Sequence, residues 1–200
     1  MKKLLYLALV MTFPLHASVV GISTHPINDN GRILSAEMTG YMSERNEMGA
    51  GLRYTQEVAR DRVLDVAVSG GQDSRGLTVG TGLDFELLDE GISQPRLSLK
   101  PYIQYERFDN TTSLMLGGAP TLRKGFSVNG QEFFPYLAVP SGMKIDSATN
   151  EFVYYASATF GMSMPFPGGQ NERILLSLEG NKDLGATSDY IGCLVSWVWN

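Results

Sequence analysis

Few residues in the 200-residue sequence have the types and spacing that catalysis requires, and histidine is scarce among them. The two histidines are His16 and His25, and His16 lies in a segment that is expected to be removed on export. Histidine-dependent hydrolases need a base beside their nucleophile. His25 precedes Pro26 after a short expected strand, which indicates a loop residue. We therefore expect no enzyme activity and assign no catalytic residue.

The other patterns that suggest chemistry each have a structural interpretation. Asp84 and Glu86 could act as an acid–base pair, but they share one face of an expected strand, where paired filling of an interior is favoured. Residues 28–31 (Asn-Asp-Asn-Gly) lack most ligands of a calcium loop. Residues 80–82 (Gly-Thr-Gly) lack the third glycine and the helix of a dinucleotide site. Cys193 is the single cysteine, which excludes disulfides and multi-cysteine metal sites. No cofactor and no metal site are expected.

The first 17 residues are typical of an export signal. Lys2 and Lys3 form a basic start, residues 4–11 are apolar, and residues 15–17 (Leu-His-Ala) resemble a small-residue cleavage site. The apolar run is shorter than the roughly 20 residues of a membrane-spanning helix. We expect a signal peptide over 1–17 and a single domain over 18–200.

The charge of the chain argues against a nucleic-acid partner. The formal net charge is -5, and loss of the two signal-peptide lysines makes it -7, so a basic patch for phosphate is not indicated. Charged residues are 18% of the sequence, below the usual share of about 25%. Few charges without a long apolar run are typical of alternating strands that face lipid.

Alternation of apolar and polar residues predicts an all-β chain. Eight segments alternate clearly and are separated by short polar turns, as in a meander. These segments are residues 32–42, 48–55, 63–69, 77–86, 97–106, 152–164, 173–179 and 191–199. A short first strand over 18–24 is also expected.

The alternation weakens around residues 117–150. Pro120, Pro135 and Pro140 break the pattern, so a long irregular segment is expected there, flanked by one or two strands. Pro101 also interrupts an otherwise clear strand, which predicts a local bulge. Because single-chain bacterial barrels have an even strand number, we expect a closed antiparallel up-and-down barrel of 8 or 10 strands.

The alternation alone leaves open which face of the barrel points inward. A soluble lipocalin-type barrel has its apolar face inside, and a transmembrane barrel has it outside. The polar face here is rich in Ser, Thr and Gly, with charges of both signs, which suits a cramped interior. That interpretation predicts a charge network in the lumen made of Glu37, Arg53, Asp65, Asp84, Glu86, Lys100, Glu106, Arg173 and Glu179.

Aromatic residues on the apolar face fit the girdles found where a barrel crosses the membrane–water interface. These predicted interface residues are Tyr54, Tyr105, Phe152, Tyr154, Trp197 and Trp199; the alternative is that they are ordinary core aromatics. With its export signal, its alternating strands and its aromatic-rich last strand (190–200), the chain resembles the small outer-membrane barrel proteins of the OmpA-membrane-domain and OmpX type. This resemblance covers the architecture and is not a family-specific motif. It implies outer-membrane lipid and the barrel-assembly machinery as partners.

These observations predict a non-enzymatic protein of the outer membrane of a Gram-negative cell. Its role would be structural, adhesive or in surface interaction and would be carried by its loops, with an unknown extracellular or periplasmic partner. Arg123 and Lys124, within the irregular segment, are the expected exposed contact residues. Two alternatives are a periplasmic lipocalin-like barrel that binds an apolar ligand and a narrow channel for small solutes.

Overall fold

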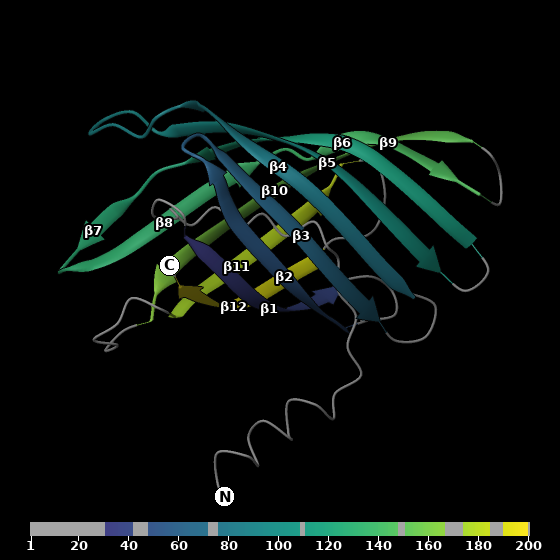
Figure 1. Ribbon diagram of the computed structural model, residues 1–200, viewed down its shortest axis with the longest axis horizontal. Helices are drawn as coiled ribbons and strands as arrows, with labels where there is room; N and C mark the ends of the chain where they lie inside the picture. The colour runs from purple at the N-terminus through teal and green to yellow at the C-terminus, as the bar shows by residue number, and fades with distance from the viewer. Residues whose placement is uncertain are drawn as a thin grey trace, which may run out of the picture.

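The computed structural model describes residues 31–41, 48–71, 76–108, 111–147, 151–166, 174–184 and 190–199, and within them it is built from β-strands (Figure 1). The strands are β1 (Arg32–Tyr41), β2 (Met48–Ala59), β3 (Arg62–Gly71), β4 (Leu77–Leu88), β5 (Arg96–Phe108), β6 (Thr111–Arg123), β7 (Phe126–Val128), β8 (Gln131–Ala138), β9 (Ser141–Asp146), β10 (Phe152–Pro165), β11 (Ile174–Asp183) and β12 (Tyr190–Trp199). The expected signal peptide, the short strand over 18–24 and His25 lie outside the described residues. Among the described residues, no helix is long and apolar enough to cross a membrane.

The strands form one closed antiparallel ring. Each of β1 to β5 pairs with the next strand, and the ring closes where β1 pairs with β12, with Arg32 opposite Trp199. On the other side, β10 pairs with β11 and β11 with β12. Between β6 and β10 stand β8 and β9, each of which pairs with both neighbours. The barrel therefore has ten strand positions, which confirms the expected fold and selects ten over eight.

The structure differs from the expected irregular segment at 117–150, because most of it is strand. β8 and β9 share one register and act as a single strand that is interrupted only at Val139 and Pro140. The interruption is still bonded: the Val139 amide donates to the Pro120 carbonyl at 3.0 Å, and the Ser157 amide donates to the Pro140 carbonyl at 2.9 Å. The prolines thus stay in the wall, because their carbonyls still accept ladder bonds although they have no N–H to donate.

β6 and β7 likewise form one interrupted strand that turns back into β8. The turn is Asn129-Gly130, and both residues have positive φ, 52° and 78°. Val128 pairs with Gln131 across it. A two-residue turn with positive φ at both positions is the type I′ geometry that suits a twisted hairpin.

Pro101 lies in β5 without the expected bulge. On the β4 side, Gly82 pairs with Tyr102 and Phe85 with Leu99, with two unpaired residues on each strand between these pairs. The register is therefore unchanged across Pro101. The missing N–H falls in this gap, and the register shift of this strand pair lies further on, between Glu86 and Leu88.

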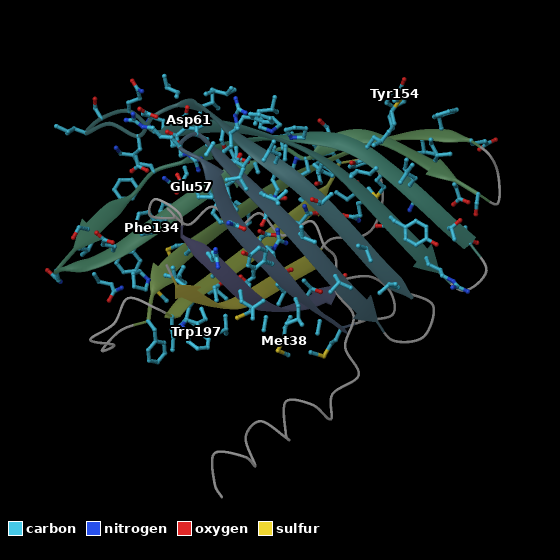
Figure 2. The ribbon with its side chains drawn as sticks, viewed as in Figure 1. Met38, Glu57, Asp61, Phe134, Tyr154 and Trp197 are labelled. Carbon is cyan, nitrogen blue, oxygen red and sulfur yellow. The ribbon has the colours of Figure 1, made fainter. Side chains whose placement is uncertain are left out.

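The apolar face of the wall points outward and the polar face inward. Exposed apolar side chains recur on every second residue, among them Leu34, Met38, Leu52, Val66, Val68, Val79, Leu99, Ile103, Leu116, Leu178 and Val195. The residues between them are buried and largely polar, including Ser35, Thr39, Thr55, Ser69, Thr78, Ser98, Gln104, Ser113, Thr121, Thr159 and Ser196. Figure 2 shows Met38 and Trp197 on the outside of the wall. The soluble lipocalin-like alternative requires the opposite arrangement.

Candidate functional site in the lumen and at its rim

Charged side chains from neighbouring strands meet inside the barrel. Arg53 of β2 lies between Glu37 of β1 and Asp65 of β3. The Arg53 Nε forms an ion pair with Glu37, and the Arg53 Nη1 is 3.6 Å from the Asp65 Oδ2. Lys100 of β5 reaches Asp65 from two strands away. The side chains of Arg53 and Glu37 are only 1% and 3% exposed. Buried charges of this kind are tolerated because each has a partner of opposite sign.

A second contact extends this cluster to the opposite wall. Tyr136 of β8 donates its hydroxyl hydrogen to Glu179 of β11, and Glu179 is close enough to Arg53 to interact electrostatically. Tyr136 pairs with Gly161 of β10, and Gly161 in turn pairs with Glu179. The phenol ring therefore lies over a glycine, where a Cβ atom would come within 2.5 Å of the ring.

Two tyrosines meet in the same manner further along the lumen. The hydroxyls of Tyr102 and Tyr155 are 2.5 Å apart. Tyr102 pairs with Gly117, Gly117 with Gly142, and Gly142 with Tyr155, so both rings lie over a pair of glycines. A Cβ on Gly117 would lie 2.5 Å from the Tyr155 hydroxyl. Glycine at these positions leaves the volume that the rings fill.

A smaller group of polar side chains lies nearby. The Lys144 ammonium of β9 is 3.0 Å from a carboxylate oxygen of Glu106. Gln104 donates to Glu106 at 2.7 Å and lies 3.6 Å from the Met115 sulfur. Glu106 is thus neutralised by Lys144, which lies in the segment that the sequence presented as irregular.

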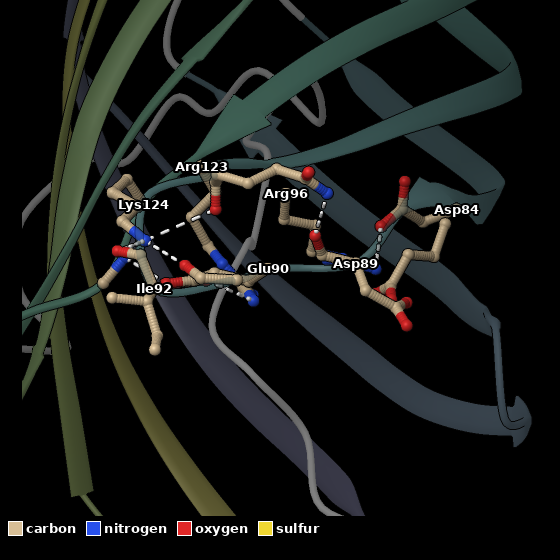
Figure 3. Close-up of polar contacts among 11 residues, drawn as sticks. Asp84, Asp89, Glu90, Ile92, Arg96, Arg123 and Lys124 are labelled. Atoms are coloured by element: carbon tan, nitrogen blue, oxygen red, sulfur yellow. Dashed lines mark hydrogen bonds and ion pairs between the residues drawn. The ribbon is translucent and has the colours of Figure 1, made fainter.

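At one end of the barrel, the last residues of β4 and the first of β5 form a separate charge cluster (Figure 3). This is the end where β1 begins and β12 finishes, and we call it the terminal end. Arg96 forms ion pairs with Glu86 and, at 3.2 Å, with Asp84. Its side chain is 10% exposed. Asp84 and Glu86 therefore pair at the rim and not with the central cluster.

The expected exposed pair, Arg123 and Lys124, is held at this rim. Arg123 is buried, lies 3.3 Å from Glu90 and packs over the Phe134 ring at 5.9 Å. The Lys124 ammonium donates to the carbonyl oxygens of Gly91, Ile92 and Gln94, as Figure 3 shows. Both cations thus fix the segment between β4 and β5, which corrects the expectation of free contact residues.

The predicted lumen residues fall into three groups. The structure brings Glu37, Arg53, Asp65 and Lys100 together, and Glu179 lies close enough to Arg53 to interact with it electrostatically. It places Asp84 and Glu86 at the rim and Glu106 with Lys144, while Arg173 lies outside the described residues. Sequence reasoning missed Tyr136, Arg96 and Lys144. The sequence does hold one signal for Tyr136. Phe134, Tyr136 and Ala138 follow one another at every second position, as residues on one face of a strand do, but Pro135 obscured this alternation.

The predicted interface aromatics lie in two groups near opposite ends of the wall. Trp197 and Tyr54 both pair with Leu34, one from each side, near the terminal end. Tyr105 and Phe152 lie in one row with Leu114 and Ile145 between them, near the other end. Figure 2 shows Tyr154 and Trp197 at opposite ends. The backbone of Trp199 pairs with Arg32. Their contact with a membrane interface stays a prediction.

The part of the chain that the structure describes holds no cluster of three or more His, Cys, Asp or Glu that could bind a metal ion. Every cluster described above pairs acids with bases or hydroxyls. The arrangement therefore stabilises and fills an interior.

A closed ladder with an apolar exterior and a charge-paired interior defines a transmembrane β-barrel. The ring strands that are not interrupted have 10 to 14 residues, enough for the roughly 9–11 tilted residues that span a bilayer. The class of the chain follows from its own pairing and from the direction of its side chains.

Comparisons with known proteins find only solved structures of low similarity. No family model and no curated protein match the chain. A solved bacterial polysaccharide outer membrane secretin has a TM-score of 0.47 at 12% identity, over 88% of this chain and 67% of its own. An outer membrane channel from Pseudomonas putida F1 has a TM-score of 0.44 at 8% identity, over 92% and 100%. The KdgM porin, in complex with disordered oligogalacturonate, has a TM-score of 0.40 at 10% identity, over 83% and 99%.

Proposed function

We propose that this chain is a non-enzymatic outer-membrane barrel with a filled lumen, whose structural, adhesive or surface-interaction role is carried by the segments at its ends. The observation that carries the proposal is the burial of Arg53, whose side chain is 1% exposed between Glu37 and Asp65. A water-filled pore passing this level would leave its lining accessible to water. A lining residue this buried instead supports a closed interior.

The width of the barrel makes this filling necessary. Eight strands leave an interior just wide enough for side chains, and the diameter grows with strand number. Ten strands therefore need large lumen residues, and Arg53, Tyr136, Lys100 and the Tyr102–Tyr155 pair supply them. Their hydrogen bonds and ion pairs cross from strand to strand, so opening the lumen would break buried polar contacts.

The exterior supports a membrane location. Soluble monomers rarely expose a contiguous apolar patch of more than a few hundred Å², whereas apolar side chains here cover the outward face of successive strands, from Leu34 on β1 to Val195 on β12. Hydrocarbon is the environment that favours such a surface, and closed barrels span bilayers because they leave no unpaired strand edge. The location we propose is the outer membrane.

Planar-bilayer recordings test the filled lumen. The refolded protein should show no conductance above background. The double variant Arg53→Ala/Tyr136→Ala removes two lumen-filling side chains and should conduct. The matched control, Leu52→Ala/Leu137→Ala, removes the adjacent outward residues and should stay silent.

Steady conductance of the unchanged protein would refute the filled lumen and favour the narrow channel for small solutes. Silence of the lumen variant, once gel mobility with and without boiling shows it to be folded, would also contradict the assignment of Arg53 and Tyr136 as the plug. Recovery of the protein in the soluble periplasmic fraction would refute the membrane location.

A further inference from the structure

The hairpin made of β7 and the start of β8 extends past the rest of the wall at the terminal end, on the left in Figure 1. It continues the pairing of β6 and β8 without a change of register. Leu122 pairs with Leu137 inside the wall, and four residues further on Phe126 pairs with Phe133. The hairpin is thus a direct continuation of the barrel wall.

The two faces of this hairpin differ in polarity. Alternation places Phe126, Val128 and Phe133 on the same side as the outward residues Leu122 and Leu137, because side chains two apart share a face. Phe126 and Val128 are 53% and 56% exposed.

The opposite face of the hairpin carries polar and charged groups. It holds the pair Ser127–Glu132 and, nearer the wall, Phe134 beneath Arg123. From Phe126 to Leu137, all of which is described, the outward face carries no charged side chain. Lys124, which precedes Phe126 on that face by alternation, has its ammonium bound by carbonyl oxygens of the segment between β4 and β5.

The hairpin is held in place from both sides. On one side, the Gly125 amide donates to Glu90, in the segment between β4 and β5, at 2.6 Å. On the other, the Gln131 side chain donates to the Pro165 carbonyl at 3.0 Å. These contacts fix the direction of the hairpin, so its apolar face stays aligned with that of the wall.

The start of the hairpin, at Phe126, lies within the thickness of the headgroup layer of a bilayer. Phe126 lies three residues beyond Arg123, which is roughly 7–8 Å along the axis at 3.3 Å per residue and a tilt of about 40°. The interfacial layer on each side of the hydrocarbon is roughly 5–8 Å thick.

We propose that this hairpin lies in the interfacial layer of the leaflet at the terminal end, with Phe126, Val128 and Phe133 against phospholipid. The inference rests on the proposed membrane location and adds to it a specific lipid contact outside the ring. Its basis is continuity: the apolar face of the hairpin is the same strand face that meets hydrocarbon at Leu122 and Leu137. Apolar and aromatic side chains at an amphipathic surface are stabilised at this boundary.

Tryptophan fluorescence in phosphatidylcholine vesicles with brominated acyl chains tests the proposal. A background with Trp197→Phe and Trp199→Phe removes the native tryptophans. Phe126→Trp then reports on the apolar face of the hairpin, and Ser127→Trp, the next residue, on the polar face. A protein that retains only Trp197 reports on the barrel wall. Phe126→Trp should be quenched roughly two- to fivefold more than Ser127→Trp, as an interfacial location of one face requires.

The outcomes separate this proposal from the membrane location. Quenching of Trp197 with equal, weak quenching of Phe126→Trp and Ser127→Trp would overturn the hairpin contact and leave the membrane barrel intact. If the emission of Phe126→Trp is blue-shifted but not quenched, and the shift is lost on dilution in lipid, a second copy of the chain covers the hairpin. That result would also overturn the lipid contact of the hairpin. Absence of quenching at Trp197 would overturn both. If Phe126→Trp fails to fold, Val128→Trp reports on the same face.

Discussion

Tyr136 reaches Glu179 by passing over Gly161, the one residue that separates them in the row of paired strands β8, β10 and β11. The contact joins two strands that are not neighbours, and it depends on the absence of a side chain between them. Glycine facing the lumen therefore has a packing role here: it leaves space for a ring that crosses over one strand to reach the next.

Gly161→Ala should destabilise the barrel. The added Cβ would come within 2.5 Å of the Tyr136 ring and 2.7 Å of the Leu178 carbonyl oxygen, and overpacking of this kind costs about 1–3 kcal/mol. Gly70→Ala is the matched control, since a Cβ there meets nothing within 4 Å. Urea unfolding of the vesicle-bound protein measures both. Equal midpoints for the two variants would show that Tyr136 has no fixed position over Gly161.

Arg53→Met should destabilise the barrel more strongly. The methionine side chain has a comparable length but leaves the buried Glu37 carboxylate without its ion-pair partner, and breaking a buried pair costs about 3–5 kcal/mol. The same unfolding measurement applies, with Arg60→Ala in the exposed β2–β3 turn as the control. A loss no larger than that of the control would mean that the Arg53–Glu37 pair contributes little to the fold.

The sequence predicted the wall better than the interior. Alternation from Leu97 to Tyr105 identifies the outward face of a strand whatever its neighbours, because that face repeats every second residue. The lumen contacts depend on which strands lie across the barrel from one another. Lys100 meets Asp65 from two strands away, and no local pattern encodes that distance.

Prolines account for the main difference between sequence and structure. Pro120, Pro135 and Pro140 suggested an irregular segment, since a proline cannot donate to a ladder. In the structure, the carbonyl groups of all three accept backbone hydrogen bonds. The strands that the prolines interrupt carry Arg123, Tyr136 and Lys144. Because the sequence did not predict these strands, it did not predict that the three residues pair with charges in the lumen and at the rim.

Lys124→Met should loosen the segment between β4 and β5. Its ammonium donates to three carbonyls of that segment, and a hydrogen bond to a charged group contributes about 1.5 kcal/mol, or about tenfold in the population of an opened state. Cleavage by a glutamate-specific protease after Glu90 should accelerate accordingly. Lys182→Met, at the other end of the barrel, is the control. Unchanged cleavage would show that Lys124 does not restrain the segment.

Leu52→Lys should weaken folding into a bilayer. Leu52 is 54% exposed on the outward face, and a lysine facing lipid near the middle of a membrane costs about 2–4 kcal/mol. Ile92→Lys, on the fully exposed rim segment, should have little effect. Folding efficiency in vesicles, read from gel mobility without boiling, compares the two. Similar efficiencies would contradict contact between Leu52 and hydrocarbon.

Labelling of the single cysteine tests most directly whether lipid covers the outward face. Cys193 is exposed on that face, so a water-soluble barrel would present it to any reagent. In vesicles, a charged, membrane-impermeant maleimide should leave Cys193 unmodified until urea unfolds the protein, whereas Ile92→Cys in a Cys193→Ser background should react at once. Rapid modification of Cys193 in the folded, vesicle-bound protein would contradict the account.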